Sequence, residues 1–178
     1  MFSSSTLPIQ ALILSHRTAP DALRERLAFP GDMLAQALKA ARHDPQLGRL
    51  VIISTCERIE LYTALPDTGP PNRQTLINWL ATWHGVDANI IANHAEYRAG
   101  IAAARHLFRV STGLESSILG EAQIVAQVAS AISASISAHA ASPVLKAVFK
   151  TAVKTGEMAR GFAWTNYNRT DIGAIAVE

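Results

Sequence analysis

The sequence predicts an α+β fold built on an antiparallel sheet, and three observations lead to it. Four short runs of apolar and β-branched residues alternate with helical patterns within the first 100 residues. The two middle runs lie close in sequence, so they pair most simply as an antiparallel hairpin. The resulting order, βαββαβ, indicates a ferredoxin-like unit, and from Gly100 onward the pattern is helical throughout.

Each element of the first part has a local signature. The expected strands cover residues 8–14, 50–53, 59–64 and 95–98. The expected helices are a short one ending near Leu27, one over residues 32–41 that begins with its N-cap at Asp32, and one from Asn72 to Gly85. Asn72 is a good N-cap residue and Gly85 a good C-terminal stop, with a turn-rich connector at 66–71 before them.

Three helices are expected after residue 100. Their apolar faces carry Leu107, Val110 and Leu114 in the first, Ile124, Val128 and Ile132 in the second, and Leu145, Phe149, Ala152 and Val153 in the third, which starts near Ser142-Pro143. We therefore divide the chain into an α+β subdomain, residues 1–100, which contains the single cysteine, and a helical subdomain, residues 101–178.

Composition limits the class of protein. With 178 residues, 49% hydrophobic and 17% charged, the chain can bury a substantial core. One cysteine excludes an internal disulfide or a CxxC pair, and residues 1–5 lack the positive segment of a signal peptide. The lone cysteine fits a reducing compartment, so the cytoplasm is the expected location. The apolar stretch 124–141 is interrupted by polar residues, so we expect no membrane span. The net charge of +2 is lower than the positive charge typical of a dedicated nucleic-acid-binding protein.

Cys56 is a candidate nucleophile, because it lies in a polar break between the two hairpin strands. Thr55 offers a hydroxyl beside it, and Arg58 offers a positive charge that favours a thiolate. The alternative is a buried cysteine that acts as a small hydrophobic residue, which is the commoner role of a free cysteine.

The other candidates are weaker. His106 shares a helix with an apolar face but is expected to lie off that face, and His16 stands beside Arg17. Gln123 and Gln127 are four residues apart on one helix and could bind a small polar ligand, or could be surface glutamines. A lysine every fourth residue from 146 to 154 could contact phosphates, although a solvated helix face explains it better. No metal-ligand spacing, GxGxxG or GxxxxGK[ST] motif is present.

Taken together, four blocks of this sequence resemble glutamyl-tRNA reductase. They are residues 15–20 with 23–25, residues 54–62, residues 106–127 and residues 169–173. The resemblance implies an NADPH-dependent oxidoreductase of tetrapyrrole (5-aminolevulinate) synthesis, in which Cys56 attacks the glutamyl ester of glutamyl-tRNA to form a thioester. Hydride from NADPH would then release glutamate-1-semialdehyde.

The resemblance also implies roles for further residues. His106 would be catalytic, assisting proton transfer or orientation, while Thr55 and Arg58 would contact the glutamyl group. The remaining substrate-contact positions of the family fall on Ser116, Glu121, Gln123 and Gln127, together with Glu57 and Ala122. This chain departs from the family at three positions: Glu57 stands for the usual Asn, Ile59 for Thr and Ala122 for Pro.

The same resemblance sets the expected cofactor and partners. By this resemblance residues 1–100 are the catalytic subdomain, and residues 101–178 complete the active site and lead to an NADPH-binding domain outside this chain. This chain would carry only the acyl-capture half of the reaction, without metal, and alone could at most form or hydrolyse the thioester. The expected partners are glutamyl-tRNA(Glu), glutamate-1-semialdehyde aminomutase as a candidate, and a second copy in a homodimer formed by a further C-terminal domain. Two alternatives remain open: a Cys56–His106 hydrolase, and a non-catalytic tRNA-binding module in which Cys56 is buried.

Overall fold

The computed structural model describes residues 7–64, 72–121 and 123–167, with side-chain surroundings as far as residue 161. The strands are β1 (Gln10–Ser15), β2 (Leu50–Ser54), β3 (Arg58–Thr63) and β4 (Glu96–Ala99). The helices are α1 (Asp21–Arg26), α2 (Asp32–His43), α3 (Arg73–His84), α4 (Ala88–His94), α5 (Ile101–Ser111), α6 (Gln123–Ser137) and α7 (Pro143–Tyr167).

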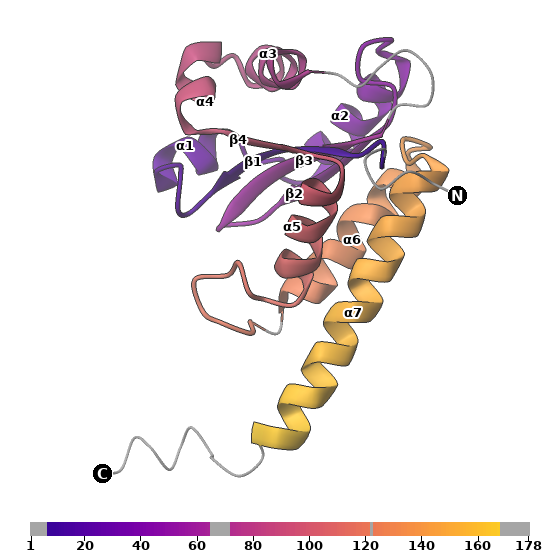
Figure 1. Ribbon diagram of the computed structural model, residues 1–178. Coiled ribbons are helices and arrows are strands. Elements are labelled where there is room, and N and C mark those ends of the chain that lie inside the picture. Colours follow the sequence, from indigo (N-terminus) through magenta and orange to yellow (C-terminus); the bar gives the residue numbers. More distant parts are fainter. Residues whose placement is uncertain (1–6, 65–71, 122, 168–178) are drawn as a thin grey trace.

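The four strands form one sheet in the order β2-β3-β1-β4, with antiparallel pairing throughout (Figure 1). This order and the element sequence confirm the ferredoxin-like α+β prediction. The hairpin of β2 and β3 pairs Ser54 with Ile59, so the turn between them carries Cys56. Helix α4 was not expected; its N-cap is Asp87, whose carboxylate accepts a hydrogen bond from the Asn89 N–H at 2.8 Å.

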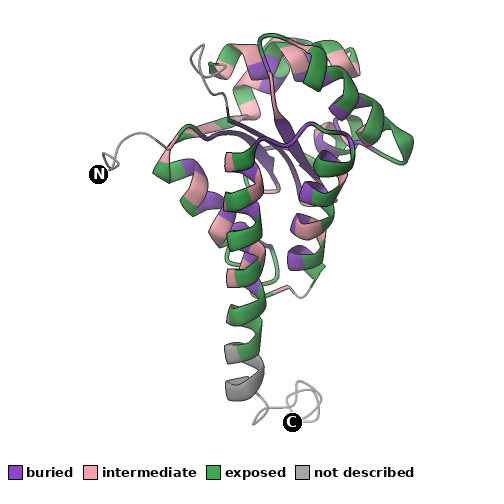
Figure 2. Ribbon diagram, turned by 90° about the vertical axis from the view of Figure 1, so that its right-hand side faces the viewer, coloured by how far each residue is buried: buried purple, intermediate pink, exposed green. Residues whose placement is uncertain are grey.

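Helices cover both faces of this sheet, as Figures 1 and 2 show. Alternate residues of β1 point to opposite sides: Leu12 and Leu14 join a core with α2, α3 and α4, whereas Ala11 and Ile13 join a second core with α5, α6 and α7. The strands are therefore apolar on both faces. Since one sheet contributes to both cores, the helices after residue 100 depend on the first part of the chain for burial, and the division into two subdomains stays a prediction.

The helix ends agree only partly with the local sequence signals. Asn72 caps α3 by accepting a hydrogen bond from the Thr75 N–H, and Gly85 ends it with a φ of 61°, both as predicted. The N-cap of α2 is Gly31 and not Asp32, which instead places its negative charge in the first turn. Leu114 does not continue the apolar face of α5, because the helix ends at Ser111 and Leu114 is 44% exposed in the following loop.

The long helix α7 packs against α5 and α6 with its apolar face. Leu145, Phe149 and Ala152 are fully buried, while Lys150 and Lys154 are exposed, which agrees with a solvated lysine face. Within the described ranges, no helix combines the length and the hydropathy needed to cross a bilayer.

Candidate functional site

Cys56 is exposed at the turn between β2 and β3. The Thr55 hydroxyl oxygen accepts hydrogen bonds from the backbone N–H groups of Glu57 and Arg58, each at 3.2 Å, and the Thr55 N–H donates to the Arg58 carbonyl at 2.9 Å. Thr55 thus fixes the turn from within. Its hydroxyl oxygen, which was expected to contact the glutamyl group, already accepts two backbone hydrogen bonds. The exposure of the thiol contradicts the alternative in which Cys56 is a buried core residue.

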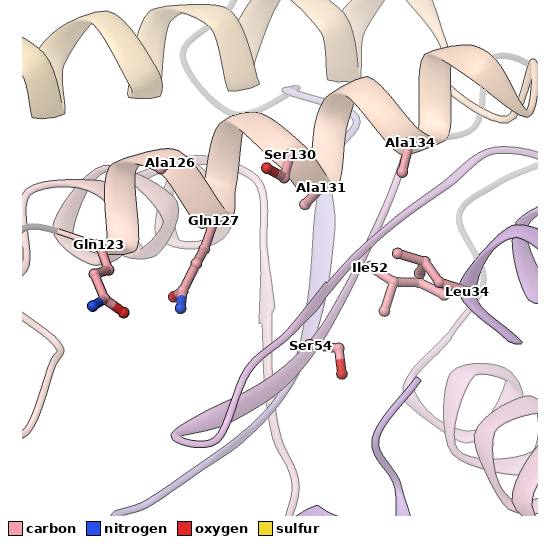
Figure 3. Close-up of a pocket in the computed structure, with 9 residues that line it drawn as sticks. All are labelled: Leu34, Ile52, Ser54, Gln123, Ala126, Gln127, Ser130, Ala131 and Ala134. Carbon is pink, nitrogen blue, oxygen red and sulfur yellow. The ribbon is translucent and has the colours of Figure 1, made fainter. Parts of the chain in front are cut away.

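Two adjoining cavities meet beside this turn. Cys56, Thr55 and Ser54 line a cavity of about 390 Å³ together with Asp21, Arg24, Glu25, Ala28, Phe29 and Pro30. Ser54 also lines a cavity of about 510 Å³, into which the amides of Gln123 and Gln127 extend from α6 toward β2 (Figure 3). Since Ser54 borders both cavities, the two glutamines and the thiol lie on neighbouring parts of one surface.

A buried charged cluster lies behind the turn, on the face of the sheet that α5 covers. The period of two along β3 places Arg58, Glu60 and Tyr62 on that face. Glu60 accepts hydrogen bonds from Arg58 Nη1 at 3.2 Å and from the Tyr62 hydroxyl at 2.6 Å, and His106 Nε2 lies 3.0 Å from its Oε1. Glu60 is 0% exposed, so all of its charge is compensated inside the protein.

His106 is therefore not a solvent-facing residue of α5, as its place in the sequence suggested. It is 3% exposed and joins Ala103, Leu107 and Val110 on the buried side of the helix. The carboxylate of Glu60 makes this burial possible, because it supplies a partner to the imidazole.

The pKa values of this cluster follow its contacts. Burial pushes the pKa of Glu60 up, but His106, Arg58 and the Tyr62 hydroxyl together hold it below its ordinary 4.5. Burial and the neighbouring Glu60 charge raise the pKa of Tyr62 well above 10.0. Glu60 is thus ionised and Tyr62 protonated at neutral pH.

Arg58 is 1% exposed and largely occupied. Besides Glu60, it donates from Nη2 to the Glu115 carbonyl at 2.6 Å, and Nη2 lies 3.6 Å from the Glu57 carboxylate. Its Nε finds no hydrogen-bond partner in the described part of the chain, and neither does the buried hydroxyl of Ser116, which follows Glu115. His106 Nδ1 is likewise without a partner in the described residues, so three unsatisfied polar atoms belong to this buried cluster and the loop that covers it.

The loop between α5 and α6 is fastened to the Cys56 turn. Glu57 accepts hydrogen bonds from both the N–H and the hydroxyl of Ser117, and Glu115 binds Arg17 at 2.7 Å and Arg109 at 2.5 Å. Burial raises the pKa of Glu57, but the Ser117 hydrogen bonds and the charges of His16 and Arg58 outweigh it, so the net shift is downward. The pKa of Glu115 is lowered in the same way, chiefly by Arg109, against burial.

The expected ligand contacts are thus only partly together. Gln123 and Gln127 face one cavity and Cys56 the adjoining one, while Arg58, Ser116 and His106 are buried behind the turn. Glu121 is half-buried, and Ala122 and residues 169–173 lie outside the described residues. No three His, Cys, Asp or Glu side chains of the described segments form a group that could hold a metal ion.

Sequence reasoning missed Glu60 and Tyr62, the centre of the buried cluster, as well as Glu115 and Arg24. A signal was present in β3, where polar side chains alternate with the apolar Ile59 and Leu61. On a strand covered on both faces, that alternation indicates a buried polar network.

The fold and the site together define a class: a ferredoxin-like domain with one exposed thiol at a hairpin turn, backed by a buried Arg–Glu–His cluster. Comparison with known proteins agrees, because residues 12–161 match the family described as glutamyl-tRNA(Glu) reductase, N-terminal domain. The chain belongs to this family.

Individual relatives agree with the family model. Over 119 residues, which are 67% of this chain, it is 42% identical to the glutamyl-tRNA reductase of Halorhodospira halophila and 44% identical to that of Stenotrophomonas maltophilia. In both cases the match covers 26% of the relative, so the chain spans about a quarter of their length. The solved glutamyl-tRNA reductase from Methanopyrus kandleri superposes with a TM-score of 0.71 at 26% identity, covering 88% of this chain and 35% of that one.

Proposed function

We propose that this chain performs the acyl-capture step of glutamyl-tRNA reduction. The sulfur of Cys56 attacks the ester carbonyl carbon that joins glutamate to the terminal ribose of its tRNA. The carbon–oxygen bond to the ribose breaks, the ribose oxygen takes up a proton, and the glutamyl group remains on Cys56 as a thioester. NADPH, bound by another domain, would supply the hydride that releases this group as glutamate-1-semialdehyde and frees the Cys56 thiolate.

The observation that carries this proposal is the placement of an exposed thiol on a turn fixed from several sides. A nucleophile reacts faster when its position is set before the substrate arrives. Cys56 also borders a cavity that adjoins the amides of Gln123 and Gln127, whose donors and acceptors suit the carboxylate and amino groups of glutamate.

The buried groups have a different part in the proposal. Arg58 Nε and the Ser116 hydroxyl are unsatisfied in the described structure, and a carboxylate of the substrate would satisfy both. Since Arg58 is 1% exposed, this contact needs the loop that carries Ser116 to move on binding. His106, bound to Glu60, orients Arg58 through that carboxylate, which favours orientation over proton transfer for His106. Glu57, Glu121 and Ala122 complete the proposed substrate contacts.

The test is a single-turnover reaction with glutamyl-tRNA labelled in the glutamate. After acid quenching, label should remain on the wild-type protein and be released by hydroxylamine, which cleaves thioesters. Cys56→Ala should carry no label. Its affinity for glutamyl-tRNA should stay within about threefold of wild type, since binding of the substrate before reaction does not need the nucleophile. Absence of label on wild-type protein that binds the tRNA would refute the proposal.

The hydrolase alternative uses the same experiment with a second readout. If water resolves the thioester, free glutamate accumulates with many turnovers per protein; a reductase half-reaction stops near one label per Cys56 until NADPH and its binding domain are supplied. The burial of His106 against Glu60 favours the second outcome, because that imidazole is not exposed to activate water.

Family membership supports the remaining expectations, which stay predictions. These are NADPH bound by another domain, glutamyl-tRNA(Glu) and glutamate-1-semialdehyde aminomutase as partners, homodimer formation outside this chain, and a cytoplasmic location.

A further inference from the structure

Arg24 connects helix α1 to the Cys56 turn. It is 7% exposed, and its guanidinium donates from Nε to the Cys56 carbonyl at 3.0 Å. The other two nitrogens donate to the Ala19 carbonyl at 2.5 Å and to the Asp21 carboxylate at 2.7 Å. A buried guanidinium with all three nitrogens engaged has one position, and it holds the carbonyl of the nucleophile residue itself.

This contact completes the fixation of the turn. Thr55 holds the backbone N–H groups of Glu57 and Arg58, and the His16 N–H donates to the Glu57 carbonyl at 2.8 Å. The Glu57 N–H that Thr55 holds and the Cys56 carbonyl belong to one peptide unit, so Thr55 restrains one end of that unit. Arg24 holds the other end, the carbonyl oxygen, and because the unit is planar, the two contacts together set the plane that follows Cys56 and so restrict the direction of its Cα–Cβ bond.

We infer that Arg24 is a positioning residue for the Cys56 thiol. The inference rests on the proposed acyl capture by Cys56. Arg24 also lines the cavity of Cys56 with its own helix, so the wall of that cavity and the nucleophile are held by the same side chain. Glu25 and Arg26, its neighbours, are exposed, which singles out Arg24 on this short helix.

The experiment compares Arg24→Met, Arg24→Lys and the control Arg26→Met in the full chain. Arg26 lies on the same helix and donates to the Gly85 carbonyl at 3.2 Å, far in sequence from the turn. Three quantities are measured: the single-turnover rate of Cys56 acylation, the affinity for glutamyl-tRNA, and hydrogen exchange of the Glu57 and Arg58 amides.

With Arg24→Met we expect acylation to slow by about 10- to 100-fold, the size of effect that a displacement near 1 Å produces. Affinity should stay within threefold, and the Glu57 and Arg58 amides should exchange faster while those of the central strands do not. Arg24→Lys should recover part of the rate, since one ammonium can still reach one carbonyl. Arg26→Met should match wild type.

The inference would be overturned if Arg24→Met acylates at the wild-type rate. It would also be overturned if Arg24→Met acylates slowly while hydrogen exchange of the turn amides is unchanged. If Arg24→Met does not fold, Arg24→Lys decides by the same three measurements. Failure of the proposed function is distinguishable, because then the wild-type protein forms no acyl-enzyme, whereas unchanged exchange at the turn refutes positioning on its own.

Discussion

Replacing Glu60 by glutamine tests whether the buried cluster holds the sheet and α5 together. The glutamine side chain has nearly the same shape but no charge, and its NH₂ group must face one of three partners: Arg58, His106 or Tyr62. Arg58 would then lose the nearer of its two carboxylates and keep only that of Glu57, 3.6 Å from Nη2. Removing one partner of a buried ion pair costs about 3–5 kcal/mol, so we expect a loss of this size in the free energy of unfolding.

Urea denaturation at pH 7 measures this loss as a lower midpoint with an unchanged slope. Glu96→Gln is the matched control, since Glu96 pairs with Arg98 at 2.8 Å but both side chains are substantially exposed. We expect the control to lose less than about 1 kcal/mol. A loss below about 1 kcal/mol for Glu60→Gln as well would show that the charge of Glu60 is not needed to compensate the buried Arg58, and would refute this role of the cluster.

The pH dependence gives the same prediction a second test. The pKa of Glu60 is lowered in the folded protein, so its ionisation stabilises the fold above the ordinary pKa of 4.5. That stabilisation is lost as the pH falls through the lower, folded pKa. The contribution of the Glu60 charge to the difference in unfolding free energy between wild type and Glu60→Gln should therefore be present above about pH 4.5 and shrink as the pH falls below it.

Two glycine pairs give further predictions. Gly113 and Gly120 have φ of 75° and 76°, so alanine at either position costs about 1 kcal/mol of backbone strain. Of these two, only Gly113 would bring its new Cβ against another backbone atom, 2.8 Å away. Gly113→Ala should therefore lose about 1–3 kcal/mol more free energy of unfolding, measured in urea, than Gly120→Ala. In α7, a Cβ on Gly156 would overlap the Ser111 carbonyl, whereas one on Gly161 meets nothing within 4 Å. Gly156→Ala should lower the thermal midpoint, and Gly161→Ala should raise stability by up to about 1 kcal/mol; equal effects within either pair would contradict the packing argument.

Local signals made much of the fold predictable. The hairpin around Cys56, the Asn72 cap and the stop at Gly85 depend on residues near one another in sequence, and each is present. The extent of α5 was less predictable, because an apolar residue at the right spacing, Leu114, continues the pattern without continuing the helix. What ends the helix there is the following loop, whose glycine at 113 adopts positive φ.

The sequence predicts several of the residues that the candidate site contains, but not how they are arranged in space. The sequence identified the thiol, but not that His106 turns inward to Glu60, since that contact joins residues 46 positions apart. Arg58 illustrates the limit further. Its position beside Cys56 predicts a free cation, yet the period of two on β3 turns it toward the second core, where Glu60 and the Glu115 carbonyl occupy it.

The nucleophile turn is consequently held at three points, two of them by segments far away in sequence. Arg24 from α1 holds the Cys56 carbonyl, Ser117 from the α5–α6 loop holds Glu57, and Glu60 of β3 together with that loop holds Arg58. Each anchor uses a charge-assisted hydrogen bond, which is stronger and more directional than a neutral one. If these anchors set the geometry together, removing two of them should slow acylation by less than the product of the single effects. Once the first substitution has displaced the turn, the second causes a smaller further loss of rate. The double variant Arg24→Lys with Glu57→Gln measures this: multiplicative losses would mean that Arg24 and Glu57 act on the thiol independently.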